Sequence, residues 1–252
     1  MPGFTGKKVL VTGGAAGLGR AHATRFGREG AHAILADIDA AGMEQTRALV
    51  ESEGGSAECH FCDMSKEADI AALGERVLAS HPKLDALINN AGLHMGEIAR
   101  GFLGLGMEKW QYFYAVNVFG PLLLAEALHP ALKAARGIVI NISSMAAYQP
   151  QTAYGITKGS LNIFTHAMAS QFAVDEIRCV AIAPGLMETP NARAGVEDAN
   201  WQRLKAMQNV KRQGTPEDIA NLAYFLASEQ GSFINNEVIH CDGGNQMRGF
   251  RI

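Results

Sequence analysis

Short runs of apolar residues alternate with longer amphipathic stretches along the whole chain. The pattern predicts seven strands, at 9–11, 33–36, 57–62, 84–89, 137–142, 177–183 and 238–241. It predicts helices between them, at 17–29, 40–53, 66–80, 107–134, 152–174 and 217–227, with Pro121 as a kink in the fourth. The strands are nearly continuous apolar runs, as expected when helices cover both faces of a parallel sheet. We therefore predict an α/β fold with a doubly wound parallel sheet, formed by a single domain over residues 1–252.

One segment, residues 186–213, interrupts this alternation. It lies between the sixth strand and the last helix, and it is too long for an ordinary connection in an α/β unit. Long insertions of this kind often close over a bound substrate. We expect this segment to act as a substrate lid.

Composition excludes several classes of protein. With 48% hydrophobic and 19% charged residues, the chain is not of the disordered class. A net charge of −3 gives no basic excess for a nucleic-acid partner, and no run of 18 apolar residues is present to span a membrane. Four cysteines are too few for a disulfide scaffold, and the N-terminus has no apolar signal-peptide region. We expect a cytoplasmic protein.

The sequence gives no reason to expect a metal site. Cys59-His60-Phe61-Cys62 invites a metal or redox interpretation. On an extended strand, however, positions 59 and 62 point to opposite faces, so core packing is favoured. The eight histidines are scattered, without a recognisable ligand spacing.

A glycine-rich turn, Thr12-Gly13-Gly14-Ala15-Ala16-Gly17-Leu18-Gly19, joins the first strand to the first helix. Glycines in this position let the backbone approach a pyrophosphate, which then lies at the helix N-terminus. A tight turn with close helix–sheet packing is the alternative interpretation. The position after a strand and before a helix favours a Rossmann-type dinucleotide site.

Asp37 ends the second strand, 18 residues after Gly19. A carboxylate here can accept hydrogen bonds from the adenosine ribose, and it would repel a 2′-phosphate. Arg20 and Arg47 are the nearest cations in the sequence that could reverse this preference. The sequence therefore favours NAD over NADP.

Polar and small residues also follow the third and fourth strands. Asp63 lies where the adenine would bind, although it could instead cap the turn ahead of Ser65. Asn89-Asn90-Ala91-Gly92 follows the fourth strand, where small residues let the backbone pass near a cofactor and Asn side chains can fix that backbone by hydrogen bonds.

Tyr154 and Lys158 are four residues apart on one predicted helix and so share a face. A nearby ammonium lowers the pKa of a tyrosine, which is ordinarily about 10. Such a pair can take the proton of an alcohol while hydride leaves its carbon. The same spacing is also common on helix surfaces. Ser143 and Ser144 follow the fifth strand and could hydrogen-bond a substrate oxygen or cap a helix.

In order and spacing, these motifs resemble the short-chain dehydrogenase/reductase family along nearly the whole chain. The residues that carry the resemblance are Thr12–Gly19, Asn89–Gly92, Asn117, Ser144, Tyr154, Lys158, Pro184-Gly185 and Cys241-Asp242-Gly243-Gly244.

The resemblance implies a role for each catalytic candidate. Tyr154 would be the general acid/base, and Lys158 would bind the nicotinamide ribose and lower the tyrosine pKa. Ser144 would orient the substrate oxygen, and Asn117 would hold a water that joins Lys158 to solvent. Tyr154 comes only ten positions after Ser144, a shorter spacing than the family pattern, so Ser143 remains an alternative.

The resemblance also implies the cofactor contacts. The pyrophosphate would lie on the glycine turn, the adenine beside Asp63, the adenosine ribose beside Asn90 and the nicotinamide carboxamide beside Thr189. The cofactor-binding residues are predicted to be Gly13, Gly17, Leu18, Gly19, Asp37, Asp63, Met64, Asn90, Ala91, Gly92, Tyr154, Lys158, Pro184, Gly185 and Thr189.

Substrate and partner predictions rest on loops and apolar helix faces. The substrate-binding candidates are His94, Tyr148, Leu186, Met187 and Trp201, which suggest a hydrophobic or aromatic small molecule. Members of the resembling family usually form homodimers or homotetramers through helices that correspond to 107–134 and 152–174. An apolar tail, Met247, Phe250 and Ile252, could also dock on a neighbouring subunit.

The predicted function is an NAD-dependent oxidoreductase that interconverts a secondary alcohol and its ketone. One alternative is a 3-oxoacyl thioester reductase that uses NADPH and an acidic carrier protein, which Asp37 disfavours. The other is a non-catalytic nucleotide-sensing protein on the same fold. The presence of Tyr154, Lys158 and Asn117 disfavours that alternative, because a sensor needs none of them.

Overall fold

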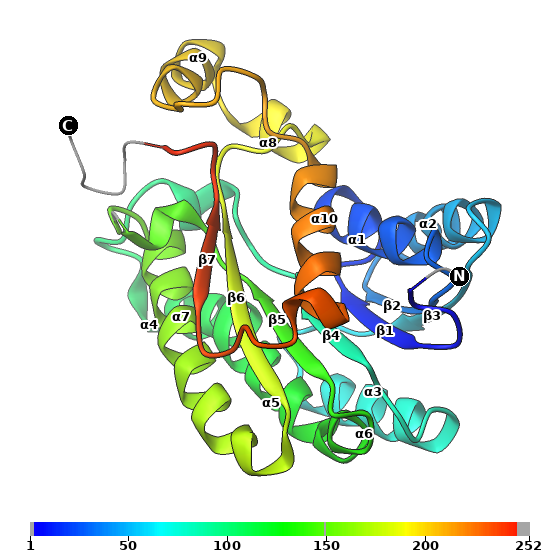
Figure 1. Ribbon diagram of the computed structural model, residues 1–252. Coiled ribbons are helices and arrows are strands. Elements are labelled where there is room, and N and C mark those ends of the chain that lie inside the picture. The colour runs from blue at the N-terminus through cyan, green and yellow to red at the C-terminus, as the bar shows by residue number, and fades with distance from the viewer. Residues whose placement is uncertain (1–2, 149, 246–252) are drawn as a thin grey trace.

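The computed structural model describes residues 3–148 and 150–245. Its sheet has seven strands in the order β3-β2-β1-β4-β5-β6-β7, and every neighbouring pair is parallel (Figure 1). The strands are β1 (Lys8–Thr12), β2 (His32–Asp37), β3 (Ser56–Phe61), β4 (Ala86–Asn89), β5 (Ile138–Ile142), β6 (Arg178–Pro184) and β7 (Val238–Cys241). The predicted doubly wound parallel sheet in a single domain is confirmed.

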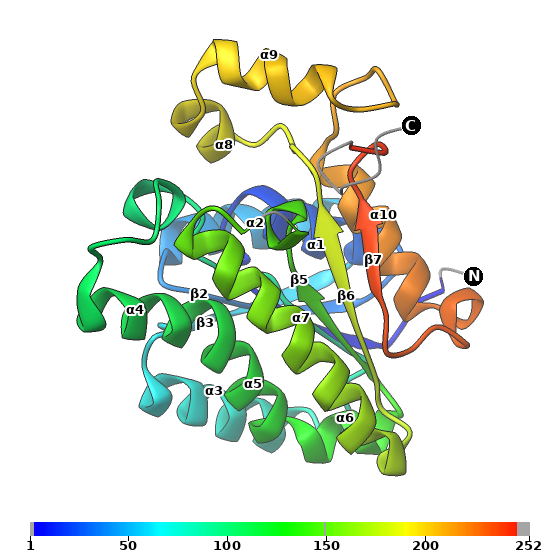
Figure 2. The same cartoon turned by 90° about the vertical axis from the view of Figure 1, so that its left-hand side faces the viewer.

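Helices cover both faces of the sheet (Figures 1 and 2). On one face lie α1 (Gly17–Gly27), α2 (Ala40–Ser52) and α10 (Pro216–Ala227). On the other lie α3 (Glu67–Ser80), α5 (Gly120–Ala127) and α7 (Ala153–Phe172). The remaining helices and helical turns are η1 (Gly96–Ala99), α4 (Gly106–Tyr114), η2 (Ala115–Phe119), α6 (His129–Ala135), η3 (Met145–Tyr148), η4 (Ala173–Asp175), α8 (Pro190–Gly195), α9 (Asp198–Ala206) and η5 (Glu229–Gly231).

Alternate residues of each central strand enter the two halves of the core, as the period of two in a strand requires. In β1, Leu10 packs with α3, α5 and α7, whereas Val9 and Val11 pack with α1 and α10. All three side chains are fully buried. The sheet is therefore held between two apolar layers, which leaves its strand ends to carry the polar residues.

The predicted single helix over 107–134, kinked at Pro121, is wrong. Pro121 lies in the first turn of α5, directly after the π-helical turn η2, because its nitrogen cannot donate to the Asn117 carbonyl four residues earlier. The sharp bend comes later, at Leu128, where Pro130 starts α6. The helical run 106–127 and α6 meet at 62°. Among the described residues no single helix is long and apolar enough to span a membrane; this bent pair passes that test only when taken together.

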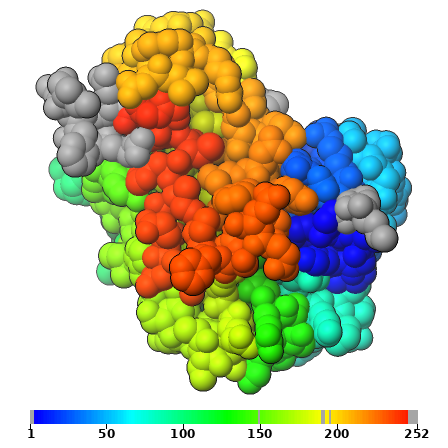
Figure 3. Space-filling model, in the orientation of Figure 1, coloured from blue at the N-terminus to red at the C-terminus, as the bar shows by residue number. Residues whose placement is uncertain are grey.

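The polar residues gather at the carboxyl edge of the sheet, around β1 and β4. These strands flank the point where the strand order reverses, which is where doubly wound sheets bind ligands. The loops after them are joined, since Thr12 Oγ1 accepts hydrogen bonds from the backbone nitrogens of Asn90 and Ala91, both at 3.0 Å. The 186–213 segment, with α8 and α9, stands over the same edge and forms the top of the molecule in Figures 1 and 3.

Candidate active site

The glycine turn is so close to the loop after β4 that side chains would not fit between them. Gly13 has a φ of +66°, and a Cβ placed on it would lie 2.9 Å from the Ala91 Cα. A Cβ on Gly19 would lie 2.0 Å from the Gly13 carbonyl oxygen and 2.7 Å from Asn90 Nδ2. Gly17, at φ +54°, faces Thr189, whose Cγ2 would be 3.8 Å from an added Cβ. The turn thus forms a backbone cradle at the N-terminus of α1 that suits a pyrophosphate.

Asn90 holds this cradle in place. Its Nδ2 donates to the carbonyl oxygens of Thr12 (2.9 Å) and Gly13 (3.2 Å). The amide nitrogen is thereby engaged by the glycine turn, so Asn90 positions the backbone at this point. Its predicted contact with the adenosine ribose stays a prediction.

Two other predicted cofactor residues contribute their side chains to the core. Leu18 packs with the apolar layer beneath α10, and Met64 is buried beside Gly120. Both are at the carboxyl edge, but their side chains are held by apolar neighbours.

Asp37, Arg20 and Arg47 all have polar partners in or near the glycine turn and α2. The Asp37 carboxylate accepts from the backbone nitrogens of Ala15 (Oδ2, 3.0 Å) and Asp39 (Oδ1, 3.0 Å). Arg20 donates to Thr46 Oγ1, to Gln45 Oε1 and to backbone carbonyls, and Arg47 forms an ion pair with Glu44. Both cations that could have reversed the NAD preference are thus engaged by groups of the glycine turn and α2.

Asp63 makes the turn contact that was the alternative interpretation. Its Oδ1 accepts from the backbone nitrogen (2.9 Å) and the hydroxyl (2.7 Å) of Ser65. The predicted adenine contact of Asp63 stays a prediction.

The four catalytic candidates come together from three parts of the chain. Tyr154 and Lys158 lie on α7, Ser144 follows β5, and Asn117 lies in the π-helical turn η2. The Lys158 ammonium donates to the Ile142 carbonyl at 2.8 Å and lies 6.0 Å from the centre of the Tyr154 ring.

Gly92, in the loop after β4, completes this group. A Cβ on Gly92 would be 3.2 Å from Lys158 Nζ and 3.3 Å from Asn117 Oδ1. The loop after β4 therefore meets the catalytic group directly and joins it to the glycine turn.

The two serines after β5 have different surroundings. The Ser143 hydroxyl is buried and donates to the Lys158 backbone carbonyl at 3.4 Å. The Ser144 hydroxyl accepts from the Ala146 nitrogen (3.1 Å) and is also hydrogen-bonded to the Tyr154 phenol. The geometry favours Ser144 as the hydroxyl that faces the reacting centre.

Burial controls the protonation of the tyrosine–lysine pair. It raises the pKa of Tyr154 above its ordinary value, and the hydrogen bond from Ser144 opposes that rise. It lowers the pKa of Lys158 to about 8. The expectation that Lys158 lowers the tyrosine pKa is not met in this arrangement, because desolvation dominates and the ammonium is directed to the Ile142 carbonyl.

Both the oxygen and the nitrogen of the Asn117 side-chain amide form hydrogen bonds within the protein. Its Oδ1 accepts from the Leu93 nitrogen (2.7 Å), and its Nδ2 donates to the Leu93 carbonyl (3.0 Å) and to Thr157 Oγ1 (3.0 Å). It thereby ties the loop after β4 to α7. A water relay at Asn117 stays a prediction.

A chain of hydrogen-bonded polar side chains crosses the buried core, and the sequence pattern did not predict it. Asn89 Nδ2 donates to Asn141 Oδ1, and Asn141 Nδ2 donates to Thr165 Oγ1, each at 2.9 Å. All three residues are fully or almost fully buried. A polar residue within the apolar runs of β4 and β5 was the available signal, because buried amides need partners.

The substrate candidates fall into two groups. His94 and Tyr148 are exposed, and the Tyr148 ring lies 4.4 Å from the His240 ring. Leu186, Met187 and Trp201 are instead buried, and their predicted contact with a substrate stays a prediction.

The buried group packs around the root and inside of the 186–213 segment. Met187 joins the core layer of α10, and Trp201 lies under the Arg193 guanidinium, 4.6 Å from the ring centre. The physical reason is that large apolar side chains at the root of an insertion gain more by packing than by facing solvent.

The remaining predicted residues lie at the end of β6 and beyond. Pro184 is buried, and an added Cβ on Gly185 would be 2.7 Å from the Asp242 Cα, so β6 and the loop after β7 are in close contact there. Thr189 caps α8 by accepting from the Ala192 nitrogen at 3.1 Å. The predicted apolar tail, Met247, Phe250 and Ile252, lies outside the described residues.

The similarity of this chain to known proteins extends over nearly its whole length. A family described as enoyl-(acyl carrier protein) reductase matches residues 13–246. The chain is 34% identical to glucose 1-dehydrogenase 2 of Bacillus subtilis, covering 96% of this chain and 95% of that protein.

Two solved structures are similarly close. One is a 7α-hydroxysteroid dehydrogenase complexed with NADH and 7-oxo glycochenodeoxycholic acid, at 28% identity with a TM-score of 0.90, covering 96% of this chain and 95% of that one. The other is L-sorbose reductase of Gluconobacter frateurii complexed with NADPH and L-sorbose, at 29% identity with a TM-score of 0.87, covering 97% and 98%.

Proposed function

Because this chain belongs to the short-chain dehydrogenase/reductase family and is an oxidoreductase that acts on CH–OH groups, we propose that it interconverts a secondary alcohol and its ketone with NAD. The single observation that carries the proposal is the convergence of Tyr154, Ser144 and Lys158 beside the glycine turn. An acid/base group and a nucleotide cradle at one sheet edge are what hydride exchange with an alcohol requires.

The residues of the cradle fit a nicotinamide dinucleotide. Gly13, Gly17 and Gly19 leave the space that side chains would fill, and the N-terminus of α1 offers backbone donors to a pyrophosphate. When bound, the nicotinamide supplies the site that accepts or gives hydride. Asp37 supports NAD rather than NADP, because its negative charge would repel a 2′-phosphate and both nearby arginines are engaged elsewhere.

The residues of this chain handle the proton and the substrate oxygen. The Tyr154 phenolate takes the alcohol proton during oxidation, and the phenol that results gives it back to the substrate oxygen during reduction. Ser144 donates a hydrogen bond to the same oxygen, which stabilises its developing charge. Lys158 places a positive charge near the Tyr154 ring. Asn117 ties the loop after β4 to α7 through Leu93 and Thr157.

The 186–213 segment is proposed to close over the substrate. Its position above the carboxyl edge supports this role, since α8 and α9 stand over the ends of β6 and β7 (Figure 2). The exposed Tyr148 and His94 would then border a pocket for a hydrophobic or aromatic alcohol.

We also propose a cytoplasmic homodimer or homotetramer. The four cysteines are free, as expected for a reducing compartment. Tyr112 on α4, Phe119 in η2 and Ile163 on α7 expose 48%, 44% and 70% of their surface, and an interface over these helices would cover them.

A second candidate is reduction of a 3-oxoacyl thioester held by an acidic carrier protein. One observation favours it: the 186–213 segment has five basic residues against three acidic ones, in a chain whose net charge is −3. Asp37 argues against the NADPH that we expect such a reductase to use.

The proposal is tested by following NADH formation with NAD and a panel of aliphatic, aromatic, sugar and steroid secondary alcohols. NADP and a 3-oxoacyl thioester with NADPH are run in parallel. Tyr154→Phe should lose turnover by a factor of about 10²–10⁴ while it still binds NADH, since it removes only the proton-transfer group. Tyr112→Phe, on the exposed face of α4, should keep full activity. Equal turnover by Tyr154→Phe and the parent, or turnover only on the thioester, would contradict the proposal.

A further inference from the structure

Three histidines surround one carboxylate at the amino edge of the sheet, far from the catalytic group. His60 Nε2 and His81 Nε2 lie 2.8 Å and 3.0 Å from Glu58 Oε1. His32 Nε2 lies 3.5 Å from Glu58 Oε2. The four side chains come from the first residue of β2, the middle of β3 and the residue that follows α3.

The fold brings these residues to one side of the sheet. Glu58 and His60 are two apart on β3 and therefore share a face, and His32 pairs with Ser56 at the start of the same face. The chain returns to this amino edge when α3 ends, which places His81 against the others. The histidines are scattered along the sequence, and the topology gathers three of them around one carboxylate.

The arrangement has the dimensions of a metal site. Within the described chain, His32, Glu58 and His81 each offer a ligand atom, and these atoms lie within 4.8 Å of one another. In a tetrahedral zinc site with bonds of about 2.0–2.1 Å, ligand atoms are about 3.4 Å apart. The separations of Glu58 from His81 and from His32, at 3.0 and 3.5 Å, fall on either side of that value.

The surrounding hydrogen bonds orient the ligands as a metal site needs. His32 Nδ1 is hydrogen-bonded to Ser56 Oγ at 2.8 Å, which turns its Nε2 toward Glu58 Oε2 at 3.5 Å. A metal-binding histidine commonly has its second ring nitrogen fixed in this way. His60 holds the Glu58 carboxylate from the side.

We propose that His32, Glu58 and His81 bind a divalent transition-metal ion such as Zn²⁺, with His60 orienting the carboxylate and a water completing the coordination. Imidazole nitrogens with one carboxylate oxygen are a donor set that suits zinc. The three ligand side chains are 12–32% exposed, which gives an ion access from solvent.

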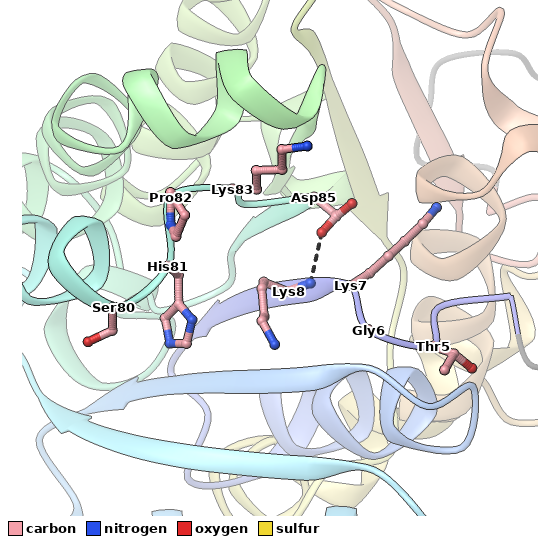
Figure 4. A pocket seen from close by; sticks show the side chains of 9 residues that line it. All are labelled: Thr5, Gly6, Lys7, Lys8, Ser80, His81, Pro82, Lys83 and Asp85. Atoms are coloured by element: carbon pink, nitrogen blue, oxygen red, sulfur yellow. Dashed lines mark hydrogen bonds between the residues drawn. The ribbon is translucent and has the colours of Figure 1, made fainter.

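Positively charged side chains near the proposed site limit its affinity for a metal ion. A cavity beside His81 has a volume of about 390 Å³ and is lined by Lys7, Lys8 and Lys83 together with Asp85 and His81 (Figure 4). The Lys8 ammonium acts on His32 by its charge and opposes a bound cation, so the site should bind Zn²⁺ more weakly than the same ligands would without it. The ion would connect β2, β3 and the end of α3, and its effect would be on stability, with turnover at the opposite edge unchanged.

The test uses the untagged chain after removal of metal with a chelator. Calorimetric titration with Zn²⁺ should give one ion per chain, and Co²⁺ should give the visible absorption bands of a four-coordinate site with nitrogen and oxygen ligands. His81→Gln should weaken Zn²⁺ binding at least tenfold, the minimum for loss of a ligand or its partner. The matched control is His129→Gln, because His129 also pairs with a carboxylate, Asp175 at 3.0 Å, but has no second histidine at that group.

Thermal unfolding supplies the second measurement. Zn²⁺ should raise the unfolding midpoint of the parent and of His129→Gln, and it should not raise that of His81→Gln. Should His81→Gln fail to fold, His60→Gln keeps the three ligands and should weaken binding by a smaller factor. The proposal is overturned by no Zn²⁺ binding to the parent, by binding unchanged in His81→Gln, or by several weak ions per chain.

Discussion

Replacing Gly19 by alanine should disrupt the nucleotide cradle. The new methyl carbon would lie 2.0 Å from the Gly13 carbonyl oxygen and 2.7 Å from Asn90 Nδ2. The first neighbour is backbone, so relief requires either the turn or the start of α1 to move by about 1 Å. Such movement would break the contact by which Asn90 fixes the turn.

The magnitude follows from two opposing effects. Overpacking of this kind costs about 1–3 kcal/mol, and alanine in place of glycine in a helix returns at most about 1 kcal/mol. The net loss of up to about 2 kcal/mol lowers the unfolding midpoint of a chain of this size by up to about 4–8 °C. Because the displaced groups form the pyrophosphate cradle, NADH affinity should fall at least tenfold, which is about 1.4 kcal/mol.

The assay is a fluorescence titration of NADH together with a thermal melt. The control is Gly159→Ala on α7, where the nearest atom to an added Cβ is the Ala147 carbonyl oxygen at 3.8 Å. That variant should bind NADH normally and melt at or above the parent temperature. NADH binding to Gly19→Ala with the parent affinity would refute the proposed cradle.

Three further outcomes are expected. Asp37→Asn should shift the ratio of kcat/KM for NAD over NADP toward NADP by about tenfold, because it removes the charge opposed to a 2′-phosphate; an unchanged ratio in paired assays would show that Asp37 does not select the cofactor. Since burial raises the pKa of Tyr154, kcat/KM for alcohol oxidation should climb with pH across the neutral range, by up to about tenfold per unit, and a flat profile in buffers of constant ionic strength would argue against tyrosine as the base. Hydrogen bonding from Arg212 lowers the Asp218 pKa to about 2, so Asp218→Asn should cost about 1–2 kcal/mol in denaturant unfolding at pH 7. That contribution is present above the ordinary carboxyl pKa of about 4 and is lost as the pH falls toward 2, where the two proteins should converge.

The sheet was predictable because its signals are local. The central strands are apolar runs, and β7 has the predicted bounds, Val238–Cys241. The approach of the two loops at the carboxyl edge also follows from topology alone, since parallel strands end at the same edge. By contrast, the break before α6 comes at Pro130, whereas the sequence pattern predicted a kink at Pro121.

The less predictable parts depend on contacts between distant residues. His32, Glu58 and His81 share no spacing that a sequence pattern could reveal, and only the pairing of β2 with β3 and the length of α3 bring them together. The burial of Trp201 likewise depends on how the 186–213 segment packs on itself. Periodicity gives the face of an element, whereas such contacts require the path of the chain in three dimensions.

The two ends of the 186–213 segment are hydrogen-bonded to each other. Met187 and Gly214 form a parallel bridge, the Glu188 nitrogen donates to the Gly214 carbonyl at 2.8 Å, and Gln213 Nε2 donates to the Leu186 carbonyl at 2.9 Å. Its two ends are therefore held together whatever lies between them. The entropy of closing such a loop grows only slowly with its length, so a longer or shorter loop between these two ends adds little closure entropy to the cost of folding. The segment proposed above as a substrate lid can therefore change in length while the sheet and the catalytic group keep their sequence.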